Sequence, residues 1–573
     1  MKKKIKELEI KRVRDKNGLY TGSLKKLNEK GKETGYIVQD FLEQKSTLEK
    51  NLSKEEAKNN LIEADKNAKN QAEKAQVKRI FAAQKTIFSI RDGMSKYKCN
   101  SDKIRMEKKK EYLTIADPYL KQHSNEVSKE FSDILNALDE YAKMDVTVVN
   151  GMIQTDLSGS MPQYSEAAYK DEEEKLKNAL ALIEQRLKSI PENETSEAKK
   201  HERTVLLGIQ NSFVTLMKGG LKVPKGQDIV IEDNKFVDIE IDDVKNEITK
   251  TEDLKMKDRR NEPLFTHEPC ANDLAQGGVG DCYLLATIAA IVDKDPEYIK
   301  NMMVDNGNGS VTVRLYGPQG VKYFTVTKST AEDTTNKYKR GGDIYVQGAL
   351  WVKMLQKAVM ASGFIDDYNL EYIEKSKAEG RMVNAKYHED RHNICEKLKQ
   401  QNKISYEAYS GGRNDVAAQI LLGEKAKKVD FDGSFKFSGQ LKEGTMTYGK
   451  KQREFLALVS NLEKTDSKYS LTVSSEGAFS SGEKTGLKEG PEARGVYNHH
   501  VYTVMGARSI DNKQFIVLRN PWGAAVNDYY YNEKTGAVSG MLDESTTSGG
   551  YLFMPVDTFF KMFGSYVKNV FKA

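Results

Sequence analysis

The chain has 573 residues, of which 38% are hydrophobic and 30% are charged, and its formal net charge is +6. This length exceeds one ordinary hydrophobic core and predicts two to four domains. The small net charge and the lack of a zinc-finger or RNA-binding motif argue against a nucleic-acid partner, and no apolar run reaches the roughly 18 residues of a membrane span.

The cysteines and the N-terminus indicate the compartment. Cys99, Cys270, Cys282 and Cys395 show no paired C-x-x-C spacing, which argues against a zinc site and a disulfide framework and favours a reducing environment. No apolar segment follows the basic start "MKKKIKELEIKRVRDKNG", so we expect no Sec-type signal peptide and a protein that is cytoplasmic or exported by a non-Sec route. Few prolines with many Lys and Asn residues are typical of an AT-rich microbial, for example bacterial, genome.

The N-terminal part divides into a basic segment, residues 1–35, and a helical domain, residues 36–220. Residues 1–35 carry 12 Lys/Arg against 5 Asp/Glu. The run "EEEKLKNALALIEQRLKSI" predicts a helix that ends before Pro191, and a further helix is expected from Ser196. One buried helical stripe is predicted from five apolar residues at helical spacing, namely Val127, Phe131, Ile134, Leu135 and Leu138. The heptads are too irregular for a long coiled coil, so we expect a bundle or an elongated array.

Residues 221–260 are predicted to form an acidic linker. Between residues 228 and 253 the chain carries 10 Asp/Glu against 3 Lys, and "FVDIEID" alternates as in a half-buried strand. One interpretation is a solvated connector. The other is an extended segment that lies along the neighbouring domain and across its cleft. The end of the segment, "KMKDRRNEP", is a candidate for self-cleavage.

Residues 261–573 show an α+β order, with helices first and an antiparallel sheet later. The runs "SVTVRLYG" and "VKYFTVT" are joined through "PQG", which predicts a hairpin. A helix, "ALWVKMLQKAVMA", comes next, and strands return at "KYSLTVSS", "HHVYTVMGA" and "QFIVLRNPWG".

Cys282 lies where the glycine-rich turn "GGVGDC" meets the apolar segment "YLLATIAAI". If a helix begins at Cys282, its unpaired N–H groups and dipole lower the pKa of the thiol and favour the nucleophilic thiolate. Glycines such as Gly280 let the backbone turn tightly and leave room for a substrate, and Asp281 suits a first helical turn. The alternative is a buried cysteine on a core helix.

A cysteine nucleophile needs a general base, which is usually a histidine held by a third group. Of the seven histidines, two belong to the helical half and His267 lies in a Pro-flanked loop. His388 and His392 have the i, i+4 spacing of metal ligands, but without a third ligand we expect a solvated helix face. His499 and His500 remain, on a strand that points them to opposite faces.

These motifs carry a resemblance to the calpain family of papain-like cysteine proteases. "QGGVGDCYLL" resembles the family's Q-G-x-x-G-D-C-W, "HVYTVMGA" its H-A-Y-S-V-T-G-A, and "VLRNPWG" its R-N-P-W-G. "LWVKMLQKAVMA", "YEAYSGG" and "GGYLFMPVDTFFKMF" resemble three further blocks in the same order. The resemblance implies a papain-like core with a Cys-bearing subdomain, about 261–425, and a His/Asn-bearing subdomain, about 426–573, behind an unrelated all-α domain.

The resemblance also implies the site. Cys282 would attack the scissile carbonyl, His500 would pair with the thiolate and then protonate the leaving amine, and Asn520 would orient the imidazole. Trp522 would shield that contact, or serve in core packing as well. Gln276 would donate to the oxyanion, or else hydrogen-bond its own loop. Tyr283 replaces the family's tryptophan, and His499 replaces its usual glycine.

The family's calcium sites are mostly missing. Asp273 matches one acid of the first site, but the partner glutamate falls at Ala349, and the acids of the second site fall near Ala525 and at Gly549 and Tyr551. Because Ca²⁺ needs several oxygen ligands, we expect no calcium switch of the usual kind and no other cofactor.

The predicted activity is therefore a cysteine endopeptidase that acts on proteins or peptides, with a regulatory or targeting role for the helical domain, for instance as an inhibitory pro-region. Three alternatives remain. A pseudo-enzyme is disfavoured because Cys282, His500, Asn520 and Gln276 are all present. A papain-like transglutaminase or deamidase shares the same triad. The helical half could also be a scaffold with the protease as an accessory domain.

Overall fold

The computed structural model describes most of the chain from residue 100 onward. The described ranges are 100–144, 149–154, 160–164, 166–242, 245–332, 343–380, 385–432, 448–464, 466–475, 499–510, 513–523, 529–532, 537–540 and 550–571. Three N-terminal strands are also described, and they form an antiparallel sheet: β1 (Lys6–Arg14), β2 (Tyr20–Leu27) and β3 (Glu33–Gly35). Within these ranges no helix combines the length and hydrophobicity needed to cross a membrane.

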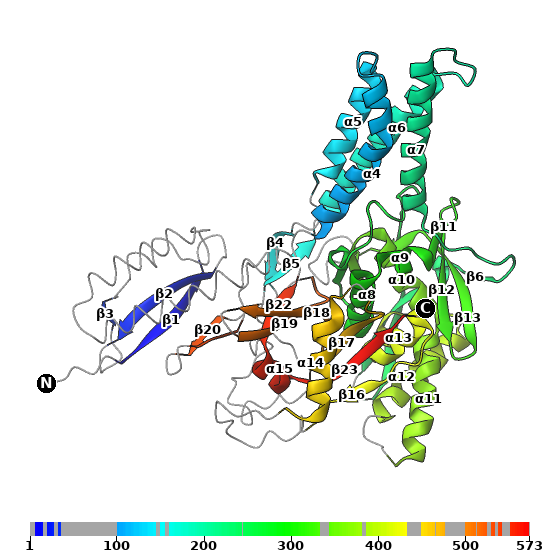
Figure 1. Ribbon diagram of the computed structural model, residues 1–573. Helices are drawn as coiled ribbons and strands as arrows, with labels where there is room; N and C mark the ends of the chain where they lie inside the picture. The colour runs from blue at the N-terminus through cyan, green and yellow to red at the C-terminus, as the bar shows by residue number, and fades with distance from the viewer. Residues whose placement is uncertain are drawn as a thin grey trace.

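Four helices form the N-terminal helical unit, which projects from the rest of the molecule (Figure 1). They are α4 (Asn100–Gln122), α5 (Lys129–Ala142), α6 (Glu166–Ser189) and α7 (Glu197–Lys218). Two of these helices begin after a serine N-cap, whose oxygen accepts a backbone N–H and so satisfies one of the unpaired donors at the helix start: Ser128 caps α5 and Ser196 caps α7. The predicted helices before Pro191 and after Ser196 are confirmed.

The predicted apolar stripe is confirmed on α5, where Phe131, Ile134 and Leu138 are fully buried against the neighbouring helices. The expectation of a helical segment over 36–220 is compared with the structure from residue 100 onward, because residues 36–99 lie outside the described residues. Within the described part it is wrong in one place. The antiparallel strands β4 (Val149–Gln154) and β5 (Ser160–Tyr164) lie between α5 and α6. The run "DVTVVNG" that leads into β4 is rich in β-branched residues, which favour strands.

The acidic segment before residue 260 forms strands instead of a solvated connector. Its elements are β6 (Asp228–Ile231), β7 (Val237–Asp242), β8 (Glu247–Asp253) and β9 (Met256–Asp258). β6 pairs in parallel with β13 (Gly320–Thr327), and β9 pairs with β14 (Ser329–Ala331). On β7 the predicted alternation is confirmed, because Val237 and Ile239 are buried. Buried Val237 and Ile239 on β7 and Ile231 at the end of β6 bind the segment to the C-terminal half, whereas β8 is largely exposed.

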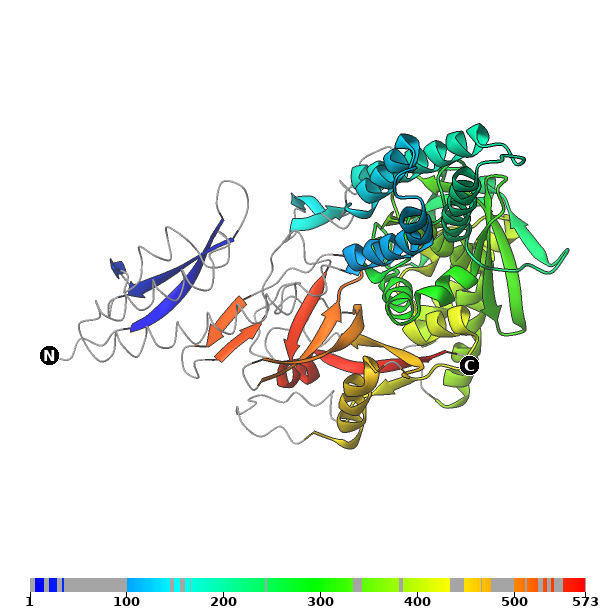
Figure 2. The ribbon, with the colours of Figure 1, turned by 45° about the horizontal axis from the view of Figure 1, so that its top comes forward.

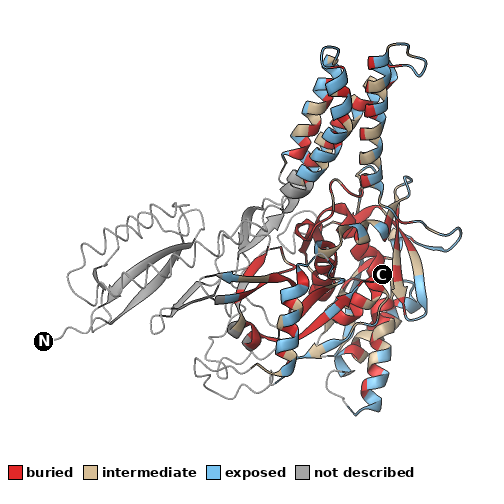
Figure 3. Ribbon diagram, viewed as in Figure 1, coloured by how far each residue is buried: buried red, intermediate tan, exposed pale blue. Residues whose placement is uncertain are grey.

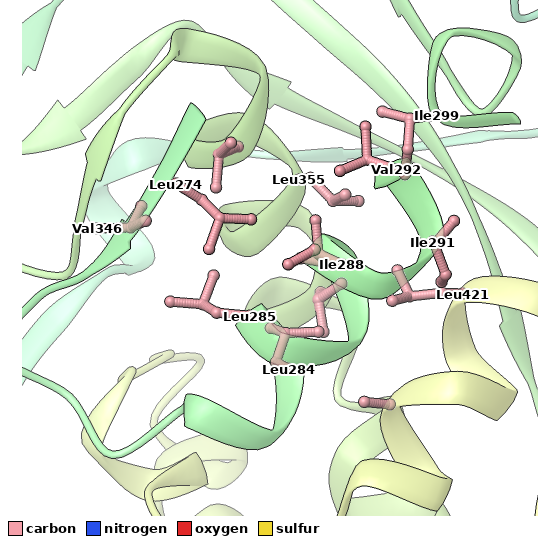
Figure 4. Packing of buried hydrophobic residues seen from close by; sticks show 14 of the residues in the cluster. Leu274, Leu284, Leu285, Ile288, Ile291, Val292, Ile299, Val346, Leu355 and Leu421 are labelled. Carbon is pink, nitrogen blue, oxygen red and sulfur yellow. The ribbon is translucent and has the colours of Figure 1, made fainter. Parts of the chain in front are cut away.

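The helix α8 (Cys282–Lys294), which is buried from Cys282 to Val292, is the centre of the next part of the chain. Its leucines and isoleucines pack against side chains from five other elements (Figure 4). The surrounding elements are β10 (Leu274–Gln276), α9 (Pro296–Asn301), β11 (Met303–Asp305), β12 (Ser310–Gly317), β15 (Val346–Gly348), α10 (Leu350–Ser362), α11 (Phe364–Ala378), α12 (Ala385–Gln400) and α13 (Asn414–Leu422). The predicted hairpin is confirmed, since β12 pairs with β13 through Gly317 and Gly320.

A six-stranded antiparallel sheet forms the C-terminal part (Figure 2). Its strands, in spatial order, are β16 (Lys428–Asp430), β23 (Phe563–Val570), β17 (Tyr469–Ser475), β18 (Val501–Ile510), β19 (Lys513–Arg519) and β22 (Tyr551–Pro555). The remaining elements are α14 (Lys450–Leu462), the pair β20 (Tyr529–Asn532) and β21 (Ala537–Gly540), and α15 (Val556–Met562). The α+β class is confirmed. Buried residues concentrate in this half, whereas the helical unit alternates buried and exposed positions (Figure 3).

Candidate active site

Cys282 is the first residue of α8 and is 7% exposed. The turn before it packs closely against the loop that contains Ser410. Gly280 N donates to Ser410 Oγ at 3.1 Å, and Gly411 N donates to Gly280 O at 2.8 Å. A Cβ atom at Gly280 would collide with Ser410 Oγ. Gly280 is therefore required by this close approach of two backbones.

Asp281 precedes the cysteine as the N-cap of α8, although its side chain does not cap the helix. The carboxyl is fully buried and accepts a hydrogen bond from Gln356 Nε2 at 2.6 Å. Burial raises the pKa of Asp281 to about 8 despite that bond. The residue thus carries a neutral carboxyl at pH 7 and adds little negative charge beside the thiol.

The thiol of Cys282 is protonated in this arrangement. Burial raises its pKa to about 12, and it outweighs the backbone N–H groups of Val501, Tyr283 and Cys282, which favour the thiolate. The expected lowering of the thiol pKa by the helix N-terminus is therefore overcome by desolvation. A thiolate must form during the reaction, because it does not stand ready in the resting site.

His500 and Asn520 lie together at one end of two adjacent inner strands of the six-stranded sheet. His500 immediately precedes β18, Asn520 immediately follows β19, and the ring Nε2 lies 2.9 Å from Asn520 Oδ1. The indole of Trp522 lies against the imidazole, with the ring centroids 4.8 Å apart, and Trp522 N donates to Asn520 Oδ1 at 3.1 Å. With Nε2 facing the amide oxygen, Nδ1 is the nitrogen that remains for proton transfer.

Burial lowers the pKa of His500 to about 4, and the bond to Asn520 only partly opposes it. The imidazole is therefore neutral at pH 7 and is suited to accept a proton. The expected standing thiolate–imidazolium pair is replaced here by a neutral thiol and a neutral base.

The strand that follows His500 packs directly on the helix that begins at Cys282. Thr503 Oγ1 on β18 donates to the carbonyl of Ala286 on α8 at 2.7 Å, and the backbone N–H of Val501 hydrogen-bonds the Cys282 thiol. These contacts bring the strand end with His500 to the helix end with Cys282. His499 has a φ of 49°, the left-handed region that favours glycine, and its side chain is exposed.

Gln276 ends β10 and is 6% exposed. Its Nε2 donates to Val279 O at 2.7 Å, within its own loop, and its backbone N–H donates to Pro521 O at 2.8 Å. The loop hydrogen bond that we considered as an alternative role is thus present. Because the amide nitrogen carries two hydrogens, this bond does not exclude donation to an oxyanion.

Tyr283, in place of the family's tryptophan, is fully buried beneath the loop around residue 410. Its hydroxyl donates to Tyr409 O at 2.9 Å, and its ring fills the space that a Cβ at Gly412 would need. The replacement therefore supports the same loop that Gly280 approaches.

His267 was not identified from its sequence, yet it joins two buried carboxylates. Its Nε2 lies 2.7 Å from Asp273 Oδ1, and its Nδ1 lies 3.2 Å from Glu172 Oε2. Burial would lower the pKa of His267, but the charges of Asp273 and Glu172 raise it well above its ordinary value. The only sequence signal was a histidine six residues before an acidic motif residue, and nothing in the pattern connects it to Glu172, 95 residues away.

Two groups of side chains have metal-ligand chemistry within the described residues. One comprises His267, Cys270 and Asp273, and the other comprises Asp366, His392 and Glu396. In the first, the 2.7 Å between His267 Nε2 and Asp273 Oδ1 is a hydrogen-bond distance. Two ligands about 2.1 Å from a tetrahedral zinc would be separated by about 3.4 Å. The geometry favours an ion pair over a metal at this place.

The second group does not include His388. His392 Nδ1 lies 3.0 Å from Asp366 Oδ1, whereas His388 is 9% exposed between the rings of Tyr372 and Tyr387. Burial lowers the pKa of His388 to about 4. The prediction of a solvated helix face is therefore wrong for His388, because α12 packs this face against aromatic side chains.

The comparisons with known proteins agree with this geometry. The sequence model of the calpain family of cysteine proteases matches residues 238–565, which is more than half of the chain. The match begins within β7 and includes the candidate catalytic residues. A search of curated proteins finds no match.

Proposed function

Because the chain belongs to the calpain family of cysteine proteases, we propose that it cleaves internal peptide bonds with Cys282, His500 and Asn520. The family establishes a cysteine-type peptidase. The observation that carries the residue assignment is the 2.9 Å contact between His500 Nε2 and Asn520 Oδ1, on strands packed against the helix that begins at Cys282. Protein or peptide substrates follow from the peptidase activity.

In the proposed mechanism, His500 acts as a general base. Its neutral Nδ1 takes the thiol proton as Cys282 Sγ attacks the scissile carbonyl, so that no buried thiolate must exist beforehand. Collapse of the tetrahedral intermediate breaks the C–N bond, and the imidazolium gives its proton to the leaving amine. Water, deprotonated by His500, then hydrolyses the thioester and releases the thiol. Asn520 accepts the Nε2–H throughout and holds the ring in one orientation.

The developing oxyanion needs N–H donors near the sulfur. The backbone N–H of Cys282 lies at the start of α8, where it has no partner within the helix, and Gln276 supplies a side-chain amide. Its bond to Val279 O fixes that amide in the loop. Replacement of one such donor costs about 10²- to 10³-fold in rate, so Gln276→Ala should lower kcat by this factor.

The proposal is tested with peptide libraries and intact proteins, using the wild type and Cys282→Ala. We expect new N-termini with the wild type alone, and covalent labelling of Cys282 by a thiol-directed peptidyl inhibitor. Products without peptide cleavage, with either a 1 Da gain at glutamine or an isopeptide link to an amine, would identify a deamidase or transglutaminase instead. No turnover of any kind by a correctly folded wild type would leave the scaffold or pseudo-enzyme alternative.

We further propose that calcium does not switch this enzyme. Asp273 Oδ1 is bonded to His267, and Oδ2 accepts from Trp351 Nε1 at 2.9 Å and from Cys270 N at 3.0 Å. Ala349 lies beside it without a carboxylate. Tyr551 is buried and donates to Asn272; the other two positions of the second site lie outside the described residues. Activity should be equal with calcium and with a chelator, and its loss in chelator would refute this proposal.

We also propose the turn of residues 222–227 as the site of any self-cleavage. That turn is largely exposed, whereas Arg259 in "KMKDRRNEP" is buried and forms two bonds of 2.9 and 2.8 Å to Asp343. Incubation of the wild type and Cys282→Ala should give a new N-terminus within 222–227 in the wild type alone. A cut at 256–262, or none, would contradict this site.

A further inference from the structure

A buried chain of charges connects the helical unit to the protease core. Arg105 NH1 on α4 lies 3.1 Å from Glu172 Oε1 on α6, and Glu172 Oε2 lies 3.2 Å from His267 Nδ1. His267 Nε2 lies 2.7 Å from Asp273 Oδ1. All four residues are at most 3% exposed. Their charges alternate in sign along this chain. Each buried ion therefore lies next to at least one ion of opposite charge.

Glu172 is the residue through which the helices hold this chain. It accepts from Arg105 within its own unit, and from Thr266 Oγ1 at 2.8 Å and His267 in the core. A second contact joins the helices to the same loop, since Tyr141 OH on α5 donates to Thr266 O. Buried side chains of the helices thus contact the loop of residues 266–273.

The other end of the chain lies at the start of the strand that carries Gln276. Asp273 ends a short 3-10 turn, and β10 begins at the next residue. Asp273 also accepts from Trp351 Nε1, and its carbonyl accepts from Ala349 N at 2.9 Å. Gln276, whose amide is the candidate oxyanion donor, therefore follows Asp273 by only three positions.

The same short strand also contacts the base side of the site. Arg519 NH2 donates to Leu274 O at 2.7 Å, and Gln276 N donates to Pro521 O at 2.8 Å. Arg519 and Pro521 flank Asn520. A displacement of β10 would therefore change the position of the Gln276 amide relative to both Cys282 and His500.

We propose that Glu172 is a positioning residue for the peptidase site, which acts through His267 and Asp273 on strand β10. This inference rests on the proposed function of Cys282 and Gln276. The helical unit is then a support of the active enzyme, and its release would impair catalysis. Displacements of about 1 Å in a catalytic group reduce rates about 10²-fold, so the effect belongs in kcat.

The helical unit offers a matched control at Glu202 on α7. Glu202 is 1% exposed and accepts from Arg186 at 2.7 Å, from Ser128 Oγ at 2.9 Å and from Tyr119 OH at 3.3 Å. Like Glu172, it is a buried carboxylate held by one arginine and two further donors. All of its partners here belong to the helical unit.

The test compares Glu172→Gln with Glu202→Gln in the full chain. Both variants should lower Tm, but Glu172→Gln alone should lower kcat by about 10- to 100-fold at unchanged KM. Hydrogen exchange of a peptide spanning 274–281 should quicken only in Glu172→Gln. If Glu172→Gln does not fold, Thr266→Val removes one hydrogen bond from the same carboxylate and should give a smaller loss of the same kind.

The outcomes separate this inference from the proposed function. A wild type without thiol-dependent cleavage refutes the proposed function and, with it, the catalytic part of the inference. An active wild type whose kcat is lowered equally by both variants, or by neither, refutes the positioning role alone. Higher activity of Glu172→Gln, or of a chain from which the helices have been cleaved and removed, would also refute it and identify an inhibitory pro-region.

Discussion

Two buried histidines show how strongly the neighbours of a side chain decide its chemistry. His267 and His500 are 3% and 5% exposed. Burial disfavours the charged ring at both, yet Asp273 and Glu172 raise the pKa of His267 well above its ordinary value. At His500 the partner is an amide, and the pKa falls to about 4. Similar burial thus accompanies a favoured imidazolium in one place and a favoured neutral imidazole in the other.

The difference separates structural from catalytic use of the same residue. A buried imidazolium between two carboxylates joins elements, because each ion would be costly without the others. A neutral imidazole held by Asn520 Oδ1 can instead accept a proton during a reaction.

The largest effect is expected from the removal of the base. His500→Gln should lower kcat/KM about 10²- to 10⁴-fold, because proton transfer from Cys282 loses its acceptor. Peptidase assays measure this loss. The matched control is His499→Gln, an exposed neighbour that should leave the rate near the wild-type value. A His500→Gln enzyme with more than a tenth of wild-type activity would contradict the assignment of the base.

Removal of the structural cation should act on stability. His267→Asn leaves two buried carboxylates facing each other without their shared cation, which should cost about 3–5 kcal/mol in the free energy of unfolding. Denaturant titration measures this loss. His392→Asn, at a partly exposed pair with Asp366, should cost less than about 1 kcal/mol. Equal losses at both sites would show that His267 is not a central link.

The cost of His267→Asn should depend on pH. The raised pKa of His267 means that its contribution is fully present below its unfolded pKa of 6.5 and is lost as the pH rises through the folded pKa. The pKa values of Glu172 and Asp273 are lowered, so their contribution is present above 4.5 and is lost in acid. The loss in the free energy of unfolding caused by His267→Asn should therefore be largest between pH 4.5 and pH 6.5 and should shrink at alkaline pH. A penalty independent of pH would contradict the charged state of His267.

The resting state of the nucleophile is tested by alkylation. With a Cys282 pKa of about 12, the rate of labelling by a small haloacetamide should rise about tenfold per pH unit between pH 7 and 9. The fraction of label on Cys282 is obtained by peptide mass spectrometry, with Cys282→Ala as the blank. A rate that is already constant above pH 6 would show a preformed ion pair.

The smallest effect is expected from a substitution that gives His500 a carboxylate partner like those of His267. Asn520→Asp places a carboxylate at the ring, which should raise the pKa of His500 by about 1–3 units. Because the base acts as the neutral imidazole, the acid limb of the kcat/KM profile should move to higher pH by the same amount. An unmoved acid limb would mean that this limb reports another group.

Local patterns in the sequence were sufficient for many elements. The apolar spacing on α5, the helix start at Ser196, the β12–β13 hairpin and the α+β order were all predicted, because each depends on residues close together in the chain. The motifs also identified Cys282, His500, Asn520 and Gln276 as candidates. The structure places His500 and Asn520 within hydrogen-bond distance of each other.

Tertiary structure decided the charges and the connections. The composition of the acidic segment favours a solvated connector, but β6 pairs with β13, and β7 buries Val237 and Ile239. The position of the Cys282 thiol at a helix N-terminus predicts a lowered pKa, but desolvation raises this pKa instead. Glu172 and His267 are 95 residues apart, and their neighbourhoods carry no common pattern. Sequence determined the local elements and the candidate chemistry, whereas burial and long-range contacts, which no local pattern encodes, determined which buried groups are charged.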